Sequence, residues 1–310
     1  MLRVPDHTRT SDTGAVWRHG LVFSLIANAT WMIQPLFWPL LKPSSAIELL
    51  AHRVVWSALV CALFVLLLGR YRAVAQLCHK PRIVALLGGA GACVATAWGV
   101  YIYAVTTGHV VEGSLGLFML PLAIVLVGVA VLRERLRPAQ WIAVGGAVVA
   151  VGILTFDYGR LPWIAVTISG LMAVYALLKK RAGAPALEGF MVECLVIVGP
   201  ALGFIGWLML TGGASVGRIS LSHTALVAAS GVITTIPLIS HAAAINRLSL
   251  TTVGILQYLN PIGQFLLGVL LLHEELSVTR WLGFGLIWVV LAVFTASSLH
   301  SHRGAASNLA

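Results

Sequence analysis

Long apolar stretches follow one another along almost the whole chain, separated by short polar segments. A transmembrane helix needs about 20 consecutive, mainly apolar residues, and ten stretches meet this requirement. They cover residues 17–40, 47–68, 83–105, 112–132, 139–157, 162–178, 190–210, 224–245, 252–272 and 279–299. Because the connections are short, the sequence predicts an all-α integral membrane protein with ten transmembrane helices in one bundle.

The charge content supports a membrane protein and argues against other classes. Charged residues make up 10% of the 310 residues, whereas soluble domains carry about 25%. The formal net charge of +10 would fit nucleic-acid binding, but the basic residues lie in short segments between apolar stretches, as in membrane proteins. The predicted partners are therefore the lipid bilayer and a small-molecule substrate, with no nucleic acid. The oligomeric state stays open.

The distribution of Lys and Arg predicts the orientation in the membrane. With the N-terminus in the cytosol, fifteen of the 20 Lys and Arg residues fall in cytosolic segments. Four fall in external segments, namely Lys42, Arg160, Arg218 and Arg280. Positive charge accumulates on the cytoplasmic side, so we expect a multi-pass protein of the cell membrane with both termini in the cytosol. The tails at 1–16 and 300–310 are expected to be irregular, and the first does not resemble a signal peptide.

Two parts of the chain match each other without a gap when one constant shift along the sequence places the first on the second. The matched pairs are Pro121 and Pro261, Gly128 and Gly268, Glu134 and Glu274, Leu136 and Leu276, Trp141 and Trp281, and Gly145 and Gly285. This indicates two repeats of five spans, at 17–157 and 162–299. An odd number of spans places the second repeat upside down in the bilayer. Inverted repeats are typical of secondary transporters, whose substrate site lies between the halves.

Several stretches carry a resemblance to a known family. The chain contains, in this order, AIELLAHRVVWS, AWGVYIYAVTTGHVVEGSLGLFMLPL, LRERLRPAQWIAV, YGRLPWIA and RLSLTTVGILQYLNPIGQFLLGVLLLHEELS. Together they resemble the EamA family of the drug/metabolite transporter superfamily, and most closely its RarD branch, the chloramphenicol-sensitivity proteins. The resemblance implies a secondary-active exporter of a small metabolite, amino acid-like compound or drug. Met32, Pro39, Ala97, Thr106, Leu117 and Leu120 depart from the branch pattern, so no substrate is carried over.

Other function classes are less well supported. A channel or a non-transporting membrane sensor stays an alternative. A membrane-embedded enzyme is the least favoured, because the sequence has neither GxSxG nor HExxH. No GxxxxGK[ST] motif is present to bind ATP. The four cysteines lack metal-ligand spacing and are interpreted as small buried residues. No metal, cofactor or catalytic residue is predicted.

Three ionisable residues at the outer end of the second span are substrate or proton-site candidates. Glu48 and His52 lie four residues apart and share a helix face, so a hydrogen bond between them is expected. Such a pair could couple a proton to transport, and Arg53 could bind an anionic group with its guanidinium fork. The alternative is a structural anchor for the start of the helix.

Two further acids are candidates because neither has a basic neighbour in sequence. Glu112 lies at the outer end of the fourth span and Glu193 near the inner end of the seventh. An unpaired carboxylate is costly in lipid, so each must find a partner, titrate or contact water. By contrast, Glu134 and Glu274 are expected to cap or pair at span ends and are not assigned to transport.

The ninth span carries a polar face beside a proline. Gln257, Asn260 and Gln264 lie at helical spacing, with Tyr258 next to them. Pro261 removes one backbone donor and interrupts the helix there. We interpret this stripe as a cavity wall, and polar contacts between helices are the alternative. Further cavity-lining candidates are Asn28, Trp31, Gln34, Trp98 and His241.

Overall fold

The computed structural model describes residues 8–132, 138–245, 247–248 and 250–307, and within these ranges the regular structure is helical throughout. The first half contains α1 (Thr8–Phe37), a 3-10 turn (Trp38–Leu41), α2 (Ala46–Leu67), α3 (Tyr71–Cys78), α4 (Pro81–Thr106), α5 (Val110–Leu132) and α6 (Pro138–Tyr158). The second half contains α7 (Trp163–Ala182), α8 (Ala186–Thr211), α9 (Leu221–Ile245), α10 (Leu250–Gln257), α11 (Leu259–Leu266), a π-helical turn (Leu267–Leu271) and α12 (Val278–Ser307).

In the described part of the chain, seven helices are long and apolar enough to cross a membrane. Three shorter apolar helices, at Val144–Tyr158, Leu259–Leu271 and Val278–Val293, accompany them. The prediction of an all-helical, multi-pass membrane protein is therefore confirmed. The predicted ninth span is interrupted at Tyr258, where Pro261 has no backbone N–H to donate to the carbonyl of Gln257.

The ends of the first and last helices differ from the prediction. The tail expected to be irregular over 1–16 is helical from Thr8, and α12 continues past residue 299 to Ser307. Neither extension contains a proline, and adding residues to an existing helix costs far less than nucleating one. The short helix α3 was not predicted, because its eight residues are too few for an apolar span.

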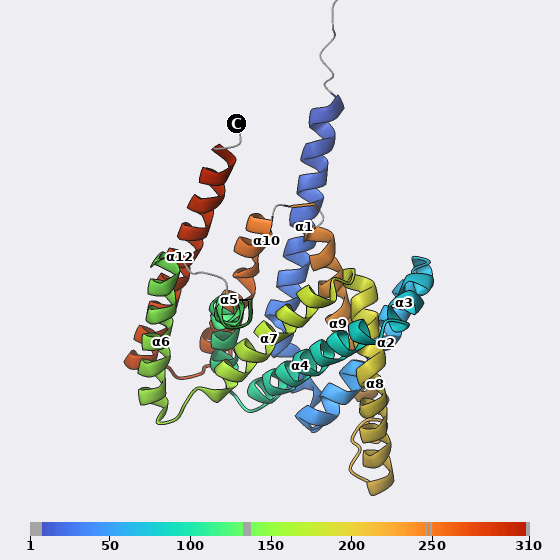
Figure 1. The fold of residues 1–310 in the computed structure, drawn as a ribbon. Helices are drawn as coiled ribbons and strands as arrows, with labels where there is room; N and C mark the ends of the chain where they lie inside the picture. Colours follow the sequence, from blue (N-terminus) through green and yellow to red (C-terminus); the bar gives the residue numbers. More distant parts are fainter. Residues whose placement is uncertain (1–7, 133–137, 246, 249, 308–310) are drawn as a thin grey trace, which may run out of the picture.

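The shift that places Pro121 on Pro261 relates helices over most of the chain. It also pairs the first residues of corresponding helices, which are Ala46 and Ala186, Pro81 and Leu221, Val110 and Leu250, and Pro138 and Val278. Figure 1 shows the last of these helix pairs, α6 and α12, side by side and running in opposite directions, and the two helices are in contact. The first turns of α1 and the last turns of α12 project to the same side of the molecule (Figure 1).

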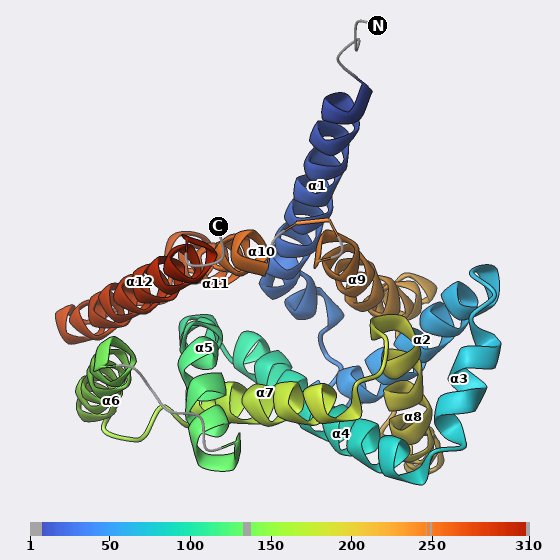
Figure 2. The ribbon, with the colours of Figure 1, turned by 45° about the horizontal axis from the view of Figure 1, so that its top comes forward.

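Helices of the two halves interleave in the body of the protein. The helix α2 packs against α8 and α9, and α4 packs against α7 and α8, while α6 and α12 pair at one flank (Figure 2). Equivalent glycines allow two of these close approaches. A Cβ on Gly91 of α4 would lie 3.3 Å from the backbone oxygen of Glu193, and one on Gly231 of α9 would lie 2.5 Å from the carbonyl carbon of Trp56. Small residues serve close helix packing in membranes in this way.

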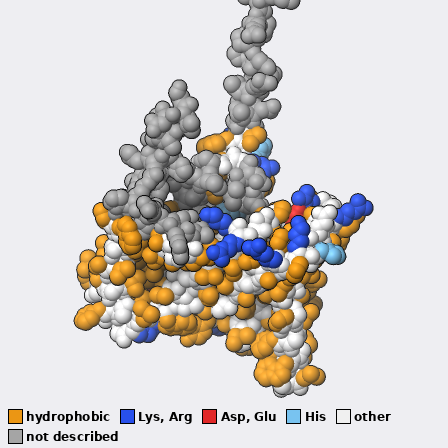
Figure 3. Space-filling view, viewed as in Figure 1, with side chains coloured by type: hydrophobic (Ala, Val, Ile, Leu, Met, Phe, Trp, Pro, Cys, Tyr) orange, Lys and Arg blue, Asp and Glu red, His pale blue; other side chains and the backbone are white. Residues whose placement is uncertain are grey.

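The outer surface is mainly apolar. Large side chains such as Leu210 and Phe156 are 91% and 88% exposed. Figure 3 shows hydrophobic side chains over most of one face, with Lys and Arg gathered along one edge, over the end of α7 and around α3. The last turn of α7 supplies Lys179, Lys180 and Arg181. An apolar face bounded by a basic edge is the surface expected of a protein embedded in lipid.

Candidate functional site

A cavity of about 270 Å³ lies between helices of both halves. Its wall is formed by Trp31, Leu50, Arg53, Val54, Ser57, Val94, Ala95, Trp98, Met172, Tyr175, Phe190, Cys194, Ile197, Thr234, Leu238, His241 and Gln257. These residues come from α1, α2 and α4 of the first half and from α7, α8, α9 and α10 of the second. Of the lining residues that the structure describes, Arg53 is the one Lys, Arg, Asp or Glu.

Arg53 is held in a fixed position in this wall. Its side chain is buried, and its Nε donates a hydrogen bond of 2.7 Å to the hydroxyl oxygen of Thr234 on α9. Thr234 in turn donates to the carbonyl of Ser230 at 2.8 Å. The guanidinium carbon lies 4.3 Å from the ring centroid of Trp98 and 5.8 Å from that of Trp38, which is cation–π geometry. Among the described residues, no acid lies within ion-pair distance of Arg53.

A second polar group lies elsewhere in the wall. The Nε2 of His241 is 3.2 Å from Nε2 of Gln257, and the His241 ring lies 5.4 Å from Trp31. Three helices, α1, α9 and α10, supply these side chains. Five sequence candidates therefore meet at one cavity: Arg53, Trp31, Trp98, His241 and Gln257.

Glu48 lies outside the cavity wall. It does not form the expected hydrogen bond with His52, because three donors from the segment before α9 occupy its carboxylate. These are the Ser215 N–H at 2.8 Å, the Ser215 hydroxyl at 2.7 Å and the Val216 N–H at 3.2 Å. The Ser215 hydroxyl also contacts Ser44, whose hydroxyl lies 3.2 Å from His223. His52 is buried nearby. This geometry fits the structural anchor better than the proton site.

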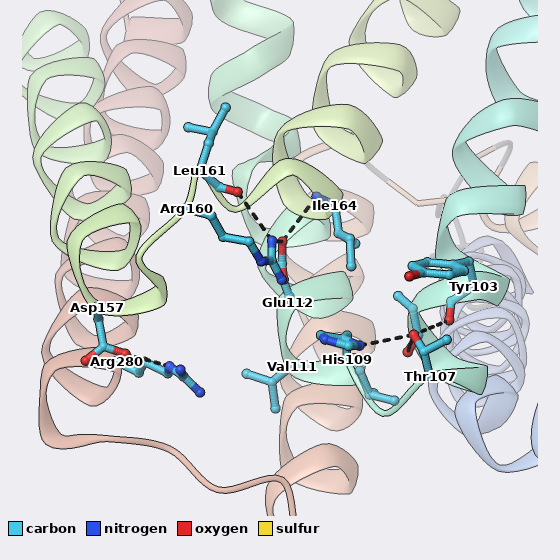
Figure 4. Close-up of polar contacts among 12 residues, drawn as sticks. Tyr103, Thr107, His109, Val111, Glu112, Asp157, Arg160, Leu161, Ile164 and Arg280 are labelled. Carbon is cyan, nitrogen blue, oxygen red and sulfur yellow. Dashed lines mark hydrogen bonds and ion pairs between the residues drawn. The ribbon is translucent and has the colours of Figure 1, made fainter.

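Glu112 has a basic partner that sequence proximity did not reveal. Its carboxylate accepts hydrogen bonds from both terminal nitrogens of Arg160, at 3.3 and 2.9 Å, and from the Ile164 N–H at 3.1 Å. Figure 4 shows Glu112 and Arg160 facing each other, with Ile164 at the start of α7. The hydrogen bond to Glu112 raises the pKa of Arg160. Glu112 thus joins α5 to the loop and first turn that follow α6.

Glu274 caps a helix, as expected from the sequence. Its two oxygens accept from the N–H groups of Val110 and Val111, at 2.5 and 2.9 Å, at the start of α5. Burial raises the pKa of the Glu274 carboxyl, while the two backbone hydrogen bonds act in the opposite direction. Carboxylates are favourable at helix N-termini, where backbone N–H groups lack partners. Glu134, its counterpart in the repeat, lies outside the described residues.

Glu193 is also paired. Lys179 of α7 donates to its Oε1 at 2.5 Å, and the Glu193 side chain is only 1% exposed. Its other oxygen, Oε2, is buried without a hydrogen-bond partner in the described structure. Glu193 does not line the cavity, although its neighbour Cys194 and Tyr175 do.

The polar face of the ninth span is divided between two roles. Gln257 lines the cavity, whereas Gln264 is fully buried and donates to the side-chain oxygen of Asn260 at 2.8 Å and to the carbonyl of Trp31 at 3.0 Å. Pro35 lacks the N–H that would bond to that carbonyl in a regular helix. Gln264 therefore joins α11 to α1, which is the polar contact between helices that was the alternative, and Asn260 bonds to Gln264 within α11. Tyr258 marks the interruption between α10 and α11.

Two lining candidates on α1 are not part of the cavity. Asn28 is buried and donates to the carbonyl of Ser24 at 2.8 Å. Gln34 is fully buried, and neither of its amide atoms has a hydrogen-bond partner among the described residues. Among the described residues that line the cavity, α1 is represented by Trp31.

Several lining residues were missed from the sequence, and the repeat could have indicated them. Residues on α2 that line the cavity have lining counterparts on α8, at the same shift that relates the repeats: Leu50 and Phe190, Val54 and Cys194, and Ser57 and Ile197. Val94 of α4 and Thr234 of α9 form a further pair. One shift therefore relates the cavity wall of one half to that of the other. The most important lining residue that the sequence analysis did not predict is Thr234, the hydrogen-bond partner of Arg53.

Comparisons with known proteins agree with this architecture. The model of the EamA-like transporter family matches residues 162–296. "Protein RarD" of Streptomyces exfoliatus is 43% identical over 292 residues, which are 94% of this chain and 93% of that protein. "Uncharacterized transporter YojE" of Bacillus subtilis is 33% identical, covering 94% and 98% of the two chains. "Chloramphenicol-sensitive protein RarD" of Pseudomonas aeruginosa is 31% identical, covering 88% and 92%. A solved structure titled "Crystal structure of protein" shares the fold, with a TM-score of 0.57, 21% identity and coverage of 92% and 98%.

Proposed function

Because this chain belongs to the RarD branch of the EamA family in the drug/metabolite transporter superfamily, we propose that it is a secondary-active exporter of a small metabolite, amino acid-like compound or drug. The observation that carries the proposal is the cavity, whose wall is shared between corresponding helices of the two halves. In secondary transporters with inverted repeats, the substrate site lies between the repeats, and rocking of one against the other gives alternating access.

The proposal includes ten membrane spans in two inverted repeats, at 17–157 and 162–299, with tails at 1–16 and 300–310 in the cytosol. The matching helix starts and the opposite directions of α6 and α12 support the inverted arrangement. The basic edge around the end of α7 lies toward the side to which the first turns of α1 and the last turns of α12 project. With the protein in the cell membrane, that edge would face the cytosol.

Cysteine labelling tests the topology. The four free cysteines, Cys61, Cys78, Cys93 and Cys194, are replaced, and single cysteines are introduced as Arg181→Cys and Glu275→Cys. An impermeant maleimide added to intact cells should label the second variant only. Labelling of both positions from the same side would contradict the inverted repeat.

Counterflow in liposomes containing the purified protein tests transport. Preloaded unlabelled solute should drive transient uptake of the same labelled solute. A channel would instead show single-channel currents, which correspond to a rate of solute passage far above the turnover of a carrier. The absence of counterflow for amino acids, carboxylates and antibiotics, in protein that is folded and inserted, would contradict the proposed function.

A further inference from the structure

Arg53 is a buried cation that has no acidic partner in the described part of the chain. Its residue exposure is 5%, and no acid among the described residues forms an ion pair with it. Each of the described buried acids on α5 and α8 has its own basic partner: Arg160 for Glu112, Arg70 for Glu188 and Lys179 for Glu193. Burying an unpaired charge is costly, so a lone guanidinium in a cavity wall indicates a site for an anion.

The guanidinium is prepared to bind such an anion. Arginine carries five N–H donors in a planar fork that matches a carboxylate. Thr234 uses the Nε donor, and the N–H groups of the two terminal nitrogens make no hydrogen bond to the described residues. Trp98 lies against the guanidinium, with 4.3 Å between the guanidinium carbon and the ring centroid. The remaining donors are therefore available to an incoming carboxylate.

The rest of the wall determines what the carboxylate is attached to. Most of the described lining side chains are apolar or aromatic, and no carboxylate is among them. Glu193, the nearest acid in sequence to the lining residues of α8, is engaged by Lys179. The ammonium group of an amino acid would therefore lack a charged partner in this cavity. This argues for a monoanion with an apolar body and against a zwitterion.

The spacing of polar groups on α9 limits the length of the solute. Thr234 and His241 are seven residues apart, which corresponds to about 10 Å along a helix. Leu238 lies between them in the wall. The cavity volume of about 270 Å³ lies just below the range for small-molecule sites, which begins at about 300 Å³. A solute with one ring or a short chain fits these limits.

We propose that the cavity binds a small monocarboxylate with an apolar or aromatic body. Its carboxylate pairs with the terminal nitrogens of Arg53, its body lies against Trp98 and Leu238, and its far end approaches His241 and Gln257. This assignment rests on the transport function proposed above and names the class of cargo.

The first experiment compares three probes of similar shape on the purified full-length protein. Phenylpropionate carries only the carboxylate, phenylalanine adds an ammonium group, and phenylpropanol is the neutral alcohol. Phenylpropionate should raise the thermal unfolding midpoint at concentrations at which the other two do not. Equal stabilisation by phenylpropanol or by phenylalanine would overturn the assignment.

The second experiment places the carboxylate at Arg53. Loss of hydrogen bonds to a charged group predicts that Arg53→Gln binds phenylpropionate about ten- to hundredfold more weakly. Lys80→Gln removes an exposed cation between α3 and α4 and should bind as the unsubstituted protein does. Unchanged affinity in a folded Arg53→Gln variant would overturn the proposal. If that variant does not fold, the comparison of the three probes decides.

Counterflow of the same probes separates this proposal from the proposed function. Arg53-dependent binding of phenylpropionate without any counterflow would retain the site and contradict transport. Counterflow of phenylpropanol as fast as that of phenylpropionate would retain transport and overturn the carboxylate assignment.

Discussion

Arg53 on α2 and Glu193 on α8 occupy equivalent positions in the two repeats and carry opposite charges on two helices that wall one cavity. Their surroundings differ. Arg53 lacks an acidic partner among the described residues, whereas Glu193 is bound by Lys179. Of these two equivalent positions, one therefore carries a cation in the cavity wall and the other an ion-paired acid that is not among the lining residues.

Removing the charge of Lys179 alone should lower stability more than removing the charges of both Lys179 and Glu193. Lys179→Met leaves the buried Glu193 carboxylate unpaired, which predicts a loss of about 3–5 kcal/mol in the free energy of unfolding. The double variant Lys179→Met with Glu193→Gln removes both charges and should recover most of that loss. Arg181→Met, an exposed control on the same helix turn, should change stability by less than about 0.5 kcal/mol. Unfolding in detergent measures all three, and a double variant no more stable than Lys179→Met would contradict the ion-pair explanation.

The pair of Glu112 and Arg160 should show an asymmetric cost. Arg160→Ala strands a carboxylate that is 1% exposed, with a predicted loss of about 3–5 kcal/mol. Glu112→Ala leaves an arginine that is 40% exposed and free to hydrate, so its predicted loss is nearer that of a hydrogen bond to a charged group, about 1.5–3 kcal/mol. Lys42→Ala, an exposed cation elsewhere in the chain, serves as control. Equal losses for the two variants would show that burial does not set the cost.

Glu48 should act on the segment before α9 rather than on protons. Glu48→Ala removes the acceptor for Ser215 and Val216, so amide hydrogen exchange should accelerate over residues 212–220. Glu48→Gln keeps an acceptor oxygen and should accelerate it less. The pH profile of transport should be the same in Glu48→Gln as in the unsubstituted protein. A shifted profile would instead restore the proton-coupling hypothesis for Glu48 and His52.

The sequence predicted the helical membrane architecture because that architecture depends on local composition, and direct matching of residues led to the hypothesis of an internal repeat. It did not reveal the partners of its acids. Arg160 is far from Glu112 in sequence, and Lys179 precedes Glu193 on a separate helix, so each pair forms only when separate elements pack.

Only some of the cavity residues were predicted, because the sequence does not show which helix faces pack together. Arg53, Gln257 and His241 stand out because polar groups are rare in apolar helices. Thr234 does not, since threonine is common there and often bonds to its own helix, as this one does to Ser230. Gln264 and Gln34 also stand out, yet both are fully buried outside the cavity wall, and Gln264 donates to the carbonyl of Trp31 on α1. Helical spacing shows which residues share a face but not what that face contacts.

Gly231 should tolerate no side chain. The nearest atoms to an added Cβ are the backbone and Cβ of Trp56, at 2.5 to 2.7 Å, and backbone cannot move aside as a side chain can. Gly231→Ala is therefore expected to separate α9 from α2 and lower the unfolding midpoint. Gly203→Ala on α8, where a Cβ meets nothing within 4 Å, should leave stability unchanged or improve it by about 0.5–1 kcal/mol through helix propensity. A Gly231→Ala variant as stable as Gly203→Ala would contradict the close packing of α2 and α9.

Two glutamines on the interrupted ninth span should give opposite results. Gln264→Leu leaves the carbonyl of Trp31 without a donor, because Pro35 has none to offer, and a buried unsatisfied acceptor predicts a loss of about 1–3 kcal/mol in stability. Gln257→Leu removes a cavity-lining amide that contacts the side chain of His241, so stability should change little while the apparent affinity for solute falls. Measuring unfolding and counterflow on both variants separates the two roles. If Gln257→Leu loses stability and Gln264→Leu loses only transport, the division of this face between cavity wall and helix contact is wrong.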